Sequence, residues 1–189
     1  MCSISKIAGA ALAVFLPLAF AAPHETCEDT TDELSCSGSS TNTCCIESSP
    51  GGLFQQVQFW DTAPPTGPSN SWTIHGLWPN NCDGTYSENC DPARAYTNIT
   101  GLLTDAGQTS VLDYMQKYWI SDDESNEAFW EHEWKTHGTC VSTLEPSCYT
   151  DYSPGEEAVA YFTTAVSLFQ ALPTYTVSPR THQDSCQQD

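Results

Sequence analysis

Alternating apolar and polar side chains predict two β-strands in the first half of the chain. The first strand covers Leu53 to Trp60. Its apolar side chains share one alternate face: Leu53, Val57 and Phe59. A loop follows over residues 61–70, which hold three prolines and a glycine. The second strand covers Trp72 to Trp78 and ends at Pro79, because proline has no N–H to donate to a neighbouring strand.

Apolar residues three or four positions apart predict helices in the second half. One helix runs from Ser110 to Trp119. Its helical spacing is carried by Leu112, Met115 and Tyr118 or Trp119. A second helix starts after Ser125, whose hydroxyl can cap it, and runs to about Thr136, with Gly138 just past its end.

A third helix is predicted to start at Ser153-Pro154-Gly155-Glu156, with Ser153 as N-cap and Glu156 reaching back to it. Its apolar stripe is Val159, Phe162, Val166 and Phe169. Strands and helices are separated along the chain, so the predicted fold class is α+β, with helices around an antiparallel central sheet.

The start of the chain has the pattern of a secretory signal peptide. An apolar run over residues 7–20 follows a lysine and leads to an Ala-Phe-Ala site. We expect cleavage after Ala21, with Ala22 as the alternative. The run is too short for a good membrane span and no other segment could cross a bilayer, so we predict a secreted protein with no membrane partner. In that setting Asn98, in the sequon Asn98-Ile99-Thr100, is the predicted glycosylation site.

Ten cysteines fit an oxidising compartment. Cys2 leaves with the signal peptide, eight lie between Cys27 and Cys148, and Cys186 stands alone near the end. Eight cysteines imply four disulfides, for which spacing alone allows about 105 pairings. The neighbours Cys44 and Cys45 cannot sensibly bond to each other. No C-x-x-C pair with a matching second pair is present, so the cysteines predict disulfides and no metal.

The chain is strongly acidic, with 24 acidic against five basic residues and a formal net charge of −19. Without Lys6, four basic residues remain and the net charge becomes −20 (4 − 24). Such a surface repels nucleic acid and anionic membranes at neutral pH. Any contact with RNA must therefore be local, and the charge favours work in acid, where carboxylates are protonated.

The segment Phe129 to Cys140 gathers groups able to move protons. On a helix, Glu133 and His137 lie on one face, and His132 and Thr136 share the neighbouring face. His132-Glu133 also resembles the start of a zinc-binding H-E-x-x-H motif, but here the second histidine comes five residues later, and the imidazoles diverge by about 140°. His137 lies at the carboxyl end of the helix, where the helix dipole and Glu133 are expected to raise its pKa.

The segment Trp72 to Pro79, Trp-Thr-Ile-His-Gly-Leu-Trp-Pro, contains a third candidate histidine. Strict alternation places His75 on the same side of the strand as Thr73 and Leu77. A lone strand histidine is usually a core residue. Here, however, Gly76 lets another group approach closely and Trp78 can stack on a base.

These two segments resemble the two catalytic segments of the ribonuclease T2 family of secreted acid endoribonucleases. The similarity runs from about Cys27 to Tyr175 and is closest to fungal members. It implies a disulfide-stapled α+β fold that acts as a monomer on single-stranded RNA. It also implies transphosphorylation by the 2′-hydroxyl, through a 2′,3′-cyclic phosphate to a 3′-phosphate end, at acid pH, without metal or cofactor. DNA lacks the nucleophile and should be inert. Delivery is extracellular, or to a vacuole.

The resemblance also implies a role for each site residue. His75 is the catalytic acid, His137 the catalytic base, and Glu133 stabilises the phosphorane-like transition state. His132 contacts the phosphate. The base would contact Trp78 and Tyr86, which sandwich it, and Asn80 beside it. The implied disulfides are Cys27–Cys45, Cys36–Cys82, Cys44–Cys148 and Cys90–Cys140.

The chain departs from the family pattern in two places. Members often carry lysine directly before the second-motif histidine, where this chain has Thr136; Lys135, one residue earlier, is the candidate phosphate contact in its stead. The resemblance also stops after Tyr175-Thr176. We therefore expect a catalytic domain over residues 22–176 that lacks the C-terminal strands, as in a truncated product or one with a retained intron. Residues 177–189 are then a disordered tail with a free Cys186.

An alternative to the enzyme is a secreted non-catalytic relative, truncated or misfolded, that at most binds RNA.

Overall fold

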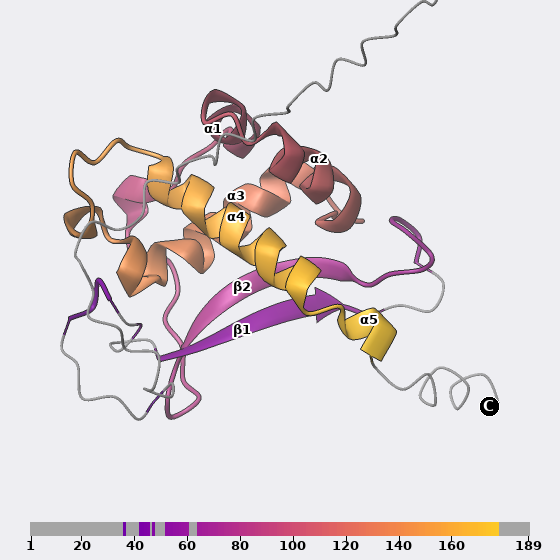
Figure 1. The fold of residues 1–189 in the computed structure, drawn as a ribbon, viewed down its shortest axis with the longest axis horizontal. Helices are drawn as coiled ribbons and strands as arrows, with labels where there is room; N and C mark the ends of the chain where they lie inside the picture. Colours follow the sequence, from indigo (N-terminus) through magenta and orange to yellow (C-terminus); the bar gives the residue numbers. More distant parts are fainter. Residues whose placement is uncertain (1–35, 37–41, 46, 48–51, 61–63, 178–189) are drawn as a thin grey trace, which may run out of the picture.

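The computed structural model describes residues 36, 42–45, 47, 52–60 and 64–177 (Figure 1). The predicted signal peptide, Cys27 and the segment 178–189 lie outside this part of the chain, so the expectations about them stay predictions. Helices together with an antiparallel sheet confirm the predicted α+β class. Among the described residues, no helix is long and apolar enough to span a membrane.

The sheet within the described ranges consists of β1 (Gly52–Phe59) and β2 (Thr73–Asn81), paired antiparallel. The register runs from Gly52 opposite Asn81 to Phe59 opposite Thr73, with an irregularity at Val57 and Gln58. Val57 pairs with Gly76 and Gln58 with Ile74, which leaves His75 as an extra residue in β2. This β-bulge lies in the motif that supplies the candidate catalytic histidine.

The prediction that Pro79 ends the second strand is wrong. Pro79 pairs with Phe54, and β2 continues to Asn81. A proline is tolerated in an edge strand where its nitrogen faces away from the partner. Beyond it, the Asn81 N–H donates to the Thr85 carbonyl over 2.8 Å, and this bond turns the chain back.

The described ranges also contain five helices, of which α4 lies along the sheet (Figure 1). Their bounds are α1 (Ile99–Asp105), α2 (Thr109–Tyr118), α3 (Asn126–Thr136), α4 (Glu156–Ala171) and α5 (Thr174–Val177). Four 3₁₀ turns join them: η1 (Pro92–Arg94), η2 (Gly138–Cys140), η3 (Ser142–Leu144) and η4 (Pro146–Cys148). The long helix α4 packs against β2, α1 and α2.

The predicted helices α2 and α3 are confirmed within one residue, and the Ser125 hydroxyl caps α3 by accepting from the Ala128 N–H. Helix α4 instead begins at Glu156, two residues later than predicted. Gly155, with a φ of 100°, interrupts the helical conformation before it. The Glu156 carboxylate still accepts from the Ser153 N–H, as predicted. The short α1, capped by Asn98, was not predicted.

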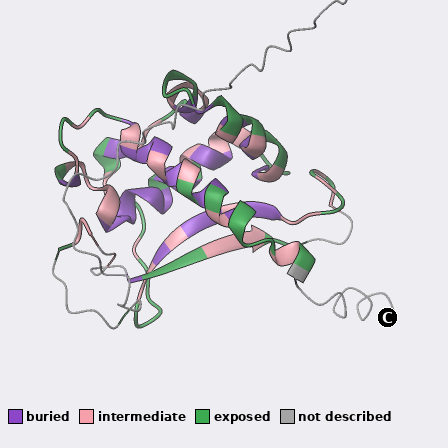
Figure 2. Cartoon of the chain, in the orientation of Figure 1, coloured by how far each residue is buried: buried purple, intermediate pink, exposed green. Residues whose placement is uncertain are grey.

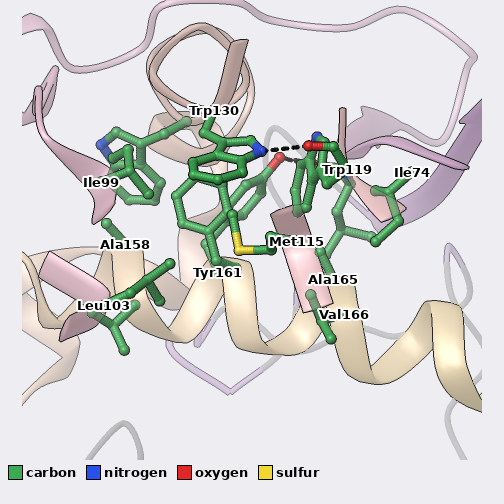
Figure 3. Close-up of a cluster of buried hydrophobic side chains, with 14 of the residues drawn as sticks. Ile74, Ile99, Leu103, Met115, Trp119, Trp130, Ala158, Tyr161, Ala165 and Val166 are labelled. Atoms are coloured by element: carbon green, nitrogen blue, oxygen red, sulfur yellow. Dashed lines mark hydrogen bonds between the residues drawn. The ribbon is translucent and has the colours of Figure 1, made fainter. Parts of the chain in front are cut away.

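Aromatic side chains dominate the core between α4 and the other helices (Figure 3). Trp119, Trp130 and Trp134 are buried, and each ring lies among neighbouring apolar side chains. The Trp130 indole N–H donates to the Trp119 carbonyl over 2.8 Å, so a buried polar group is satisfied. The predicted stripe of α4 is buried at all four positions: Val159, Phe162, Val166 and Phe169. Figure 2 shows these purple inner faces opposite green outer ones.

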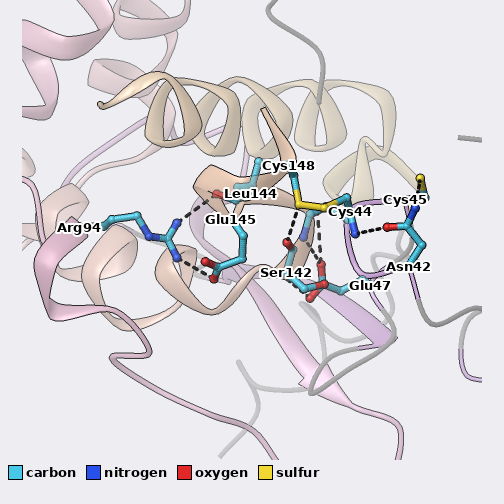
Figure 4. Close-up of a disulfide and its surroundings, with 10 residues drawn as sticks. Asn42, Cys44, Cys45, Glu47, Arg94, Ser142, Leu144, Glu145 and Cys148 are labelled. Atoms are coloured by element: carbon cyan, nitrogen blue, oxygen red, sulfur yellow. Dashed lines mark hydrogen bonds and ion pairs between the residues drawn. A yellow bond between two sulfur atoms is a disulfide. The ribbon is translucent and has the colours of Figure 1, made fainter. Parts of the chain in front are cut away.

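Disulfides join segments that are far apart in the sequence. Three implied pairs are present: Cys36–Cys82, Cys90–Cys140 and Cys44–Cys148, the last of which is drawn in Figure 4. Cys45 is also disulfide-bonded, while its implied partner Cys27 lies outside the described residues. Beside Cys44–Cys148, the Glu47 carboxylate accepts from the backbone N–H groups of Ser142 and Thr143. The N-terminal segment is thus held against η3 and η4.

Tyr161→Phe should lower the free energy of unfolding by about 1–3 kcal/mol, because it leaves two buried backbone groups unpaired. The Tyr161 hydroxyl accepts from the Leu77 N–H over 3.3 Å and donates to the Leu77 carbonyl over 3.0 Å. Tyr114→Phe is the matched control, because that hydroxyl makes no hydrogen bond within the described part of the chain. Urea titrations of both variants measure the difference; equal losses would contradict this role of Tyr161.

Candidate active site

A cavity of about 440 Å³ opens between β2, α3 and the loop after β2. Seven predicted site residues line it: His75, Trp78, Asn80, Tyr86, His132, Glu133 and His137. Three residues that the sequence did not single out also line it: Gln55, Gly84 and Glu88. Lys135 is exposed and is not among the lining residues. The two motifs therefore meet in space at one hollow.

The bulge in β2 determines where His75 points. The prediction that His75 shares a side with Leu77 is wrong, because the extra residue shifts the alternation by one. Leu77 belongs to the buried core cluster, whereas His75 lies 5.0 Å from the Trp78 ring, centroid to centroid. The Phe59 ring stacks on the His75 imidazole with 4.4 Å between ring centroids, and the centroid of Phe129 lies 5.6 Å from that of His75. His75 is thus held by aromatic rings at the cavity edge.

Glu133 lies at the centre of the site and is 0% exposed. Its Oε2 accepts from the Trp78 indole N–H over 2.9 Å. Its Oε1 has no hydrogen-bond partner and lies 3.4 Å from His75 Nε2, a pair that becomes an ion pair when His75 carries a proton. A buried carboxylate with one unsatisfied oxygen is costly unless a cationic partner approaches it.

The predicted close approach at Gly76 is confirmed. A Cβ atom at this position would overlap Glu133 Oε2 and would lie 2.6 Å from Trp78 Nε1. The carboxylate therefore lies directly against the backbone of β2. Any side chain at position 76 would push the Glu133 carboxylate away from β2.

His137 caps the carboxyl end of α3, where its backbone N–H donates to the Glu133 carbonyl. It is 8% exposed, and the Trp78 ring stacks on it at 4.6 Å. The expected rise of its pKa is wrong. Burial lowers the pKa of His137 below its ordinary value, and the charges of Glu133 and Glu88 oppose this without overcoming it. Nearby His132 and His75 act in the same direction as burial.

The loop after β2 is tied to the end of α3. The Asn89 N–H donates to the Thr136 carbonyl over 3.0 Å, and Cys90 is bonded to Cys140. These links bring Tyr86, which is 63% exposed, and Glu88 to the cavity edge opposite His137. The exposed imidazole of His132 faces the same cavity from α3. In the described part of the chain, no group of three or more potential ligands is arranged to hold a metal ion.

Comparison with known proteins points to one family. Residues 24–180 match the model of the ribonuclease T2 family. Ribonuclease Le2 of Lentinula edodes is 59% identical over 149 residues, which cover 77% of this chain and 62% of the relative. Ribonuclease T2 of Aspergillus oryzae is 56% identical over 134 residues, which cover 71% of this chain and 48% of the relative.

Among solved structures, that of Actibind, described as one of the T2 ribonucleases that are antitumorigenic agents, matches with a TM-score of 0.71. It is 53% identical and covers 76% of this chain, which in turn covers 61% of that structure. The chain thus spans between 48% and 62% of the length of these relatives.

Glu133→Gln should lower the pKa of His137 further, because it removes the largest influence that favours the charged imidazole. Glu88→Gln should act in the same direction and less strongly. The control is Glu131→Gln, since Glu131 lies on the same helix but accepts from the Asn98 N–H and is not among the charges that shift the pKa of His137. NMR titration of the imidazole resonances measures all three. A His137 pKa that rises in Glu133→Gln would contradict this electrostatic account.

Proposed function

Because the chain belongs to the ribonuclease T2 family, we propose that it is an endoribonuclease that cleaves single-stranded RNA without a metal ion. One observation carries the proposal. Two imidazoles, His75 and His137, flank the buried carboxylate of Glu133 in a single cavity. Two imidazoles, one neutral and one protonated, supply a general base and a general acid at mildly acidic pH.

The reaction uses the 2′-hydroxyl of RNA as its nucleophile. His137 takes the hydroxyl proton as the oxygen attacks the adjacent phosphorus, and His75 gives a proton to the departing 5′-oxygen. The products are a 2′,3′-cyclic phosphate and a free 5′-hydroxyl. Water then opens the ring by the reverse proton transfers and leaves a 3′-phosphate. Each proton transfer contributes about 10²–10⁴-fold to the rate.

Glu133 acts by charge, without exchanging a proton with the substrate. Its Oε1 faces His75, and the Glu133 carboxylate also favours the charged form of His137. It thereby stabilises whichever imidazole carries the proton while charge develops on the phosphorane-like transition state. His132 contacts the phosphate from the cavity wall, and Lys135 reaches it from outside the cavity by its long side chain.

The remaining lining residues hold the base. Trp78 and Tyr86 offer aromatic faces, and Asn80 offers a hydrogen-bonding amide beside them. Trp78 also covers His137 and donates to Glu133, so base binding and proton transfer share one side chain. Because the acidic surface repels RNA, contact with RNA is confined to this local site. The expected setting is extracellular or vacuolar, for a monomer glycosylated at Asn98, which is exposed.

A non-catalytic RNA-binding protein is the second candidate. It is favoured by the place of Lys135, the candidate phosphate contact, which is exposed and is not among the described residues that line the cavity. Incubation with RNA near pH 5 separates the two, since only the enzyme leaves 2′,3′-cyclic ends.

His75→Ala and His137→Ala should each lower kcat by at least about 10²-fold, because each removes one proton carrier. The matched control is His132→Ala, the third histidine of the cavity, which should chiefly raise KM. Circular dichroism checks that all three variants fold. Cleavage of RNA in EDTA should equal that without chelator, and a DNA oligonucleotide should stay intact. A His137→Ala variant with most of its rate retained would refute the role given to this base.

The rate should follow a bell-shaped pH profile with its maximum in mild acid. His137 works as a free base, and burial holds its pKa below the ordinary value of 6.5. As the pH rises through that lowered pKa, His137 loses its proton and the rate increases. Above neutrality the rate falls, because the acidic surface then repels RNA more strongly. Measurement of kcat/KM from pH 3 to 9 tests this; a rate still climbing at pH 9 would overturn the assignment.

A further inference from the structure

The segment that carries His137 is bound by a buried cation, the guanidinium of Arg94. Arg94, in η1, is 4% exposed. Of the three described basic residues, it is the buried one; Lys117 and Lys135 are exposed. A buried guanidinium is costly unless its N–H groups are paired. Arg94 must therefore be stabilised by specific partners, and these partners indicate what it does.

Arg94 satisfies its donors through four acceptors, of which Leu144 and Glu145 are drawn in Figure 4. Nε donates to Asp91 Oδ2 over 2.8 Å, and Nη1 donates to the Leu144 carbonyl over 3.1 Å. Nη2 donates to the Thr139 carbonyl and to Glu145 Oε1, each over 2.9 Å. The bond to Thr139 is buried and reaches the backbone two residues beyond His137.

The same residue also holds the chain before His137. The Arg94 carbonyl accepts from the Trp134 indole N–H over 2.6 Å, and the guanidinium lies 5.9 Å from the centroid of the Trp134 ring. Trp134 is 0% exposed and lies three residues before His137. Arg94 therefore contacts the residues on both sides of His137 and leaves the imidazole itself free to face the cavity.

Little room is left for this segment to move. A Cβ atom at Gly138 would overlap the Trp134 ring, so the chain leaves α3 directly against that indole. The Thr139 hydroxyl donates to the Lys135 carbonyl over 2.8 Å, and Thr139 is 0% exposed. A shift of Thr139 or Trp134 would therefore carry His137 with it.

We propose that Arg94 is a positioning residue for the catalytic base, which it places by holding the Thr139 carbonyl after His137 and the Trp134 indole before it. That His137 is a catalytic base rests on the proposed function, whereas the anchoring by Arg94 does not. Without the anchor, the turn at Gly138 loosens, the imidazole is hydrated, and the distance from base to 2′-hydroxyl is no longer held.

Arg94→Lys tests this, because lysine keeps the charge but cannot reach Thr139, Leu144 and Asp91 together. We expect kcat to fall by about 10- to 100-fold, as a small misplacement of a catalytic group does. KM should stay within about twofold, since substrate contacts are kept. The pKa of His137 should rise toward its ordinary value, because burial is the main cause of its depression.

Glu145→Gln is the matched control. It removes a charged partner of the same guanidinium on its exposed side, where Glu145 is 43% exposed, and leaves the Thr139 bond in place. It should change neither kcat nor the pKa of His137. If Arg94→Lys does not fold, Trp134→Phe removes the other anchor while keeping an aromatic ring, and should raise the pKa of His137 in the same way.

The readouts separate the two proposals. If the wild-type protein does not cleave RNA but the pKa of His137 rises in Arg94→Lys, the proposed function fails and the anchoring stands. A folded Arg94→Lys or Trp134→Phe with unchanged His137 pKa and unchanged kcat would overturn the positioning role. So would a Glu145→Gln variant with the same loss as Arg94→Lys.

Discussion

The buried carboxylate of Glu133 is the constraint on which the site depends. A carboxylate removed from water needs donors, and here β2 must lie close to α3 to supply them. The indole of Trp78 provides one hydrogen bond, His75 faces the second oxygen, and the missing side chain of Gly76 makes room for the contact. The same carboxylate limits how far burial can depress the pKa of His137. The arrangement of both histidines thus follows from one desolvated charge.

The residues behind the site are buried and paired, whereas its rim is open. Trp130 and Trp134 of α3 each donate to a backbone carbonyl, and the buried Arg94 pairs with two carbonyls and two carboxylates. On the cavity side, Tyr86 and His132 are exposed. This division suits a site that must hold proton carriers still while it admits a flexible polymer.

Much of this arrangement could be predicted from the sequence, because strong local patterns determine it. Period-two and helical spacing predicted the two strands and helices α2 and α3, and the motifs indicated His75, Glu133 and His137 as one site. Local patterns could not reveal the bulge, since it depends on the pairing of β1 with β2. The pKa of His137 was predicted in the wrong direction for a similar reason. The dipole and Glu133 are visible in the sequence, but desolvation depends on tertiary packing.

The aromatic partners of His75 and the residues at the cavity edge could not be predicted from the sequence either, because their contacts depend on tertiary structure. Phe59 and Phe129 come from separate elements, and neither spacing nor composition indicates that they flank an imidazole. Glu88 reaches the cavity because Asn89 and Cys90 tie its loop to α3. Arg94 likewise acquires its partners only when η1, η2 and η3 come together.

The bulge at His75 makes the pairing of β1 with β2 irregular and, by the same step, places an imidazole in the cavity. A single-residue deletion at this point of β2 would restore continuous pairing with β1, because each β1 residue already has a partner without it. The repaired ladder would have one more regular step, and it would lack the imidazole that faces Glu133 Oε1. Fully regular pairing of β1 with β2 and the placement of His75 against Glu133 therefore exclude each other.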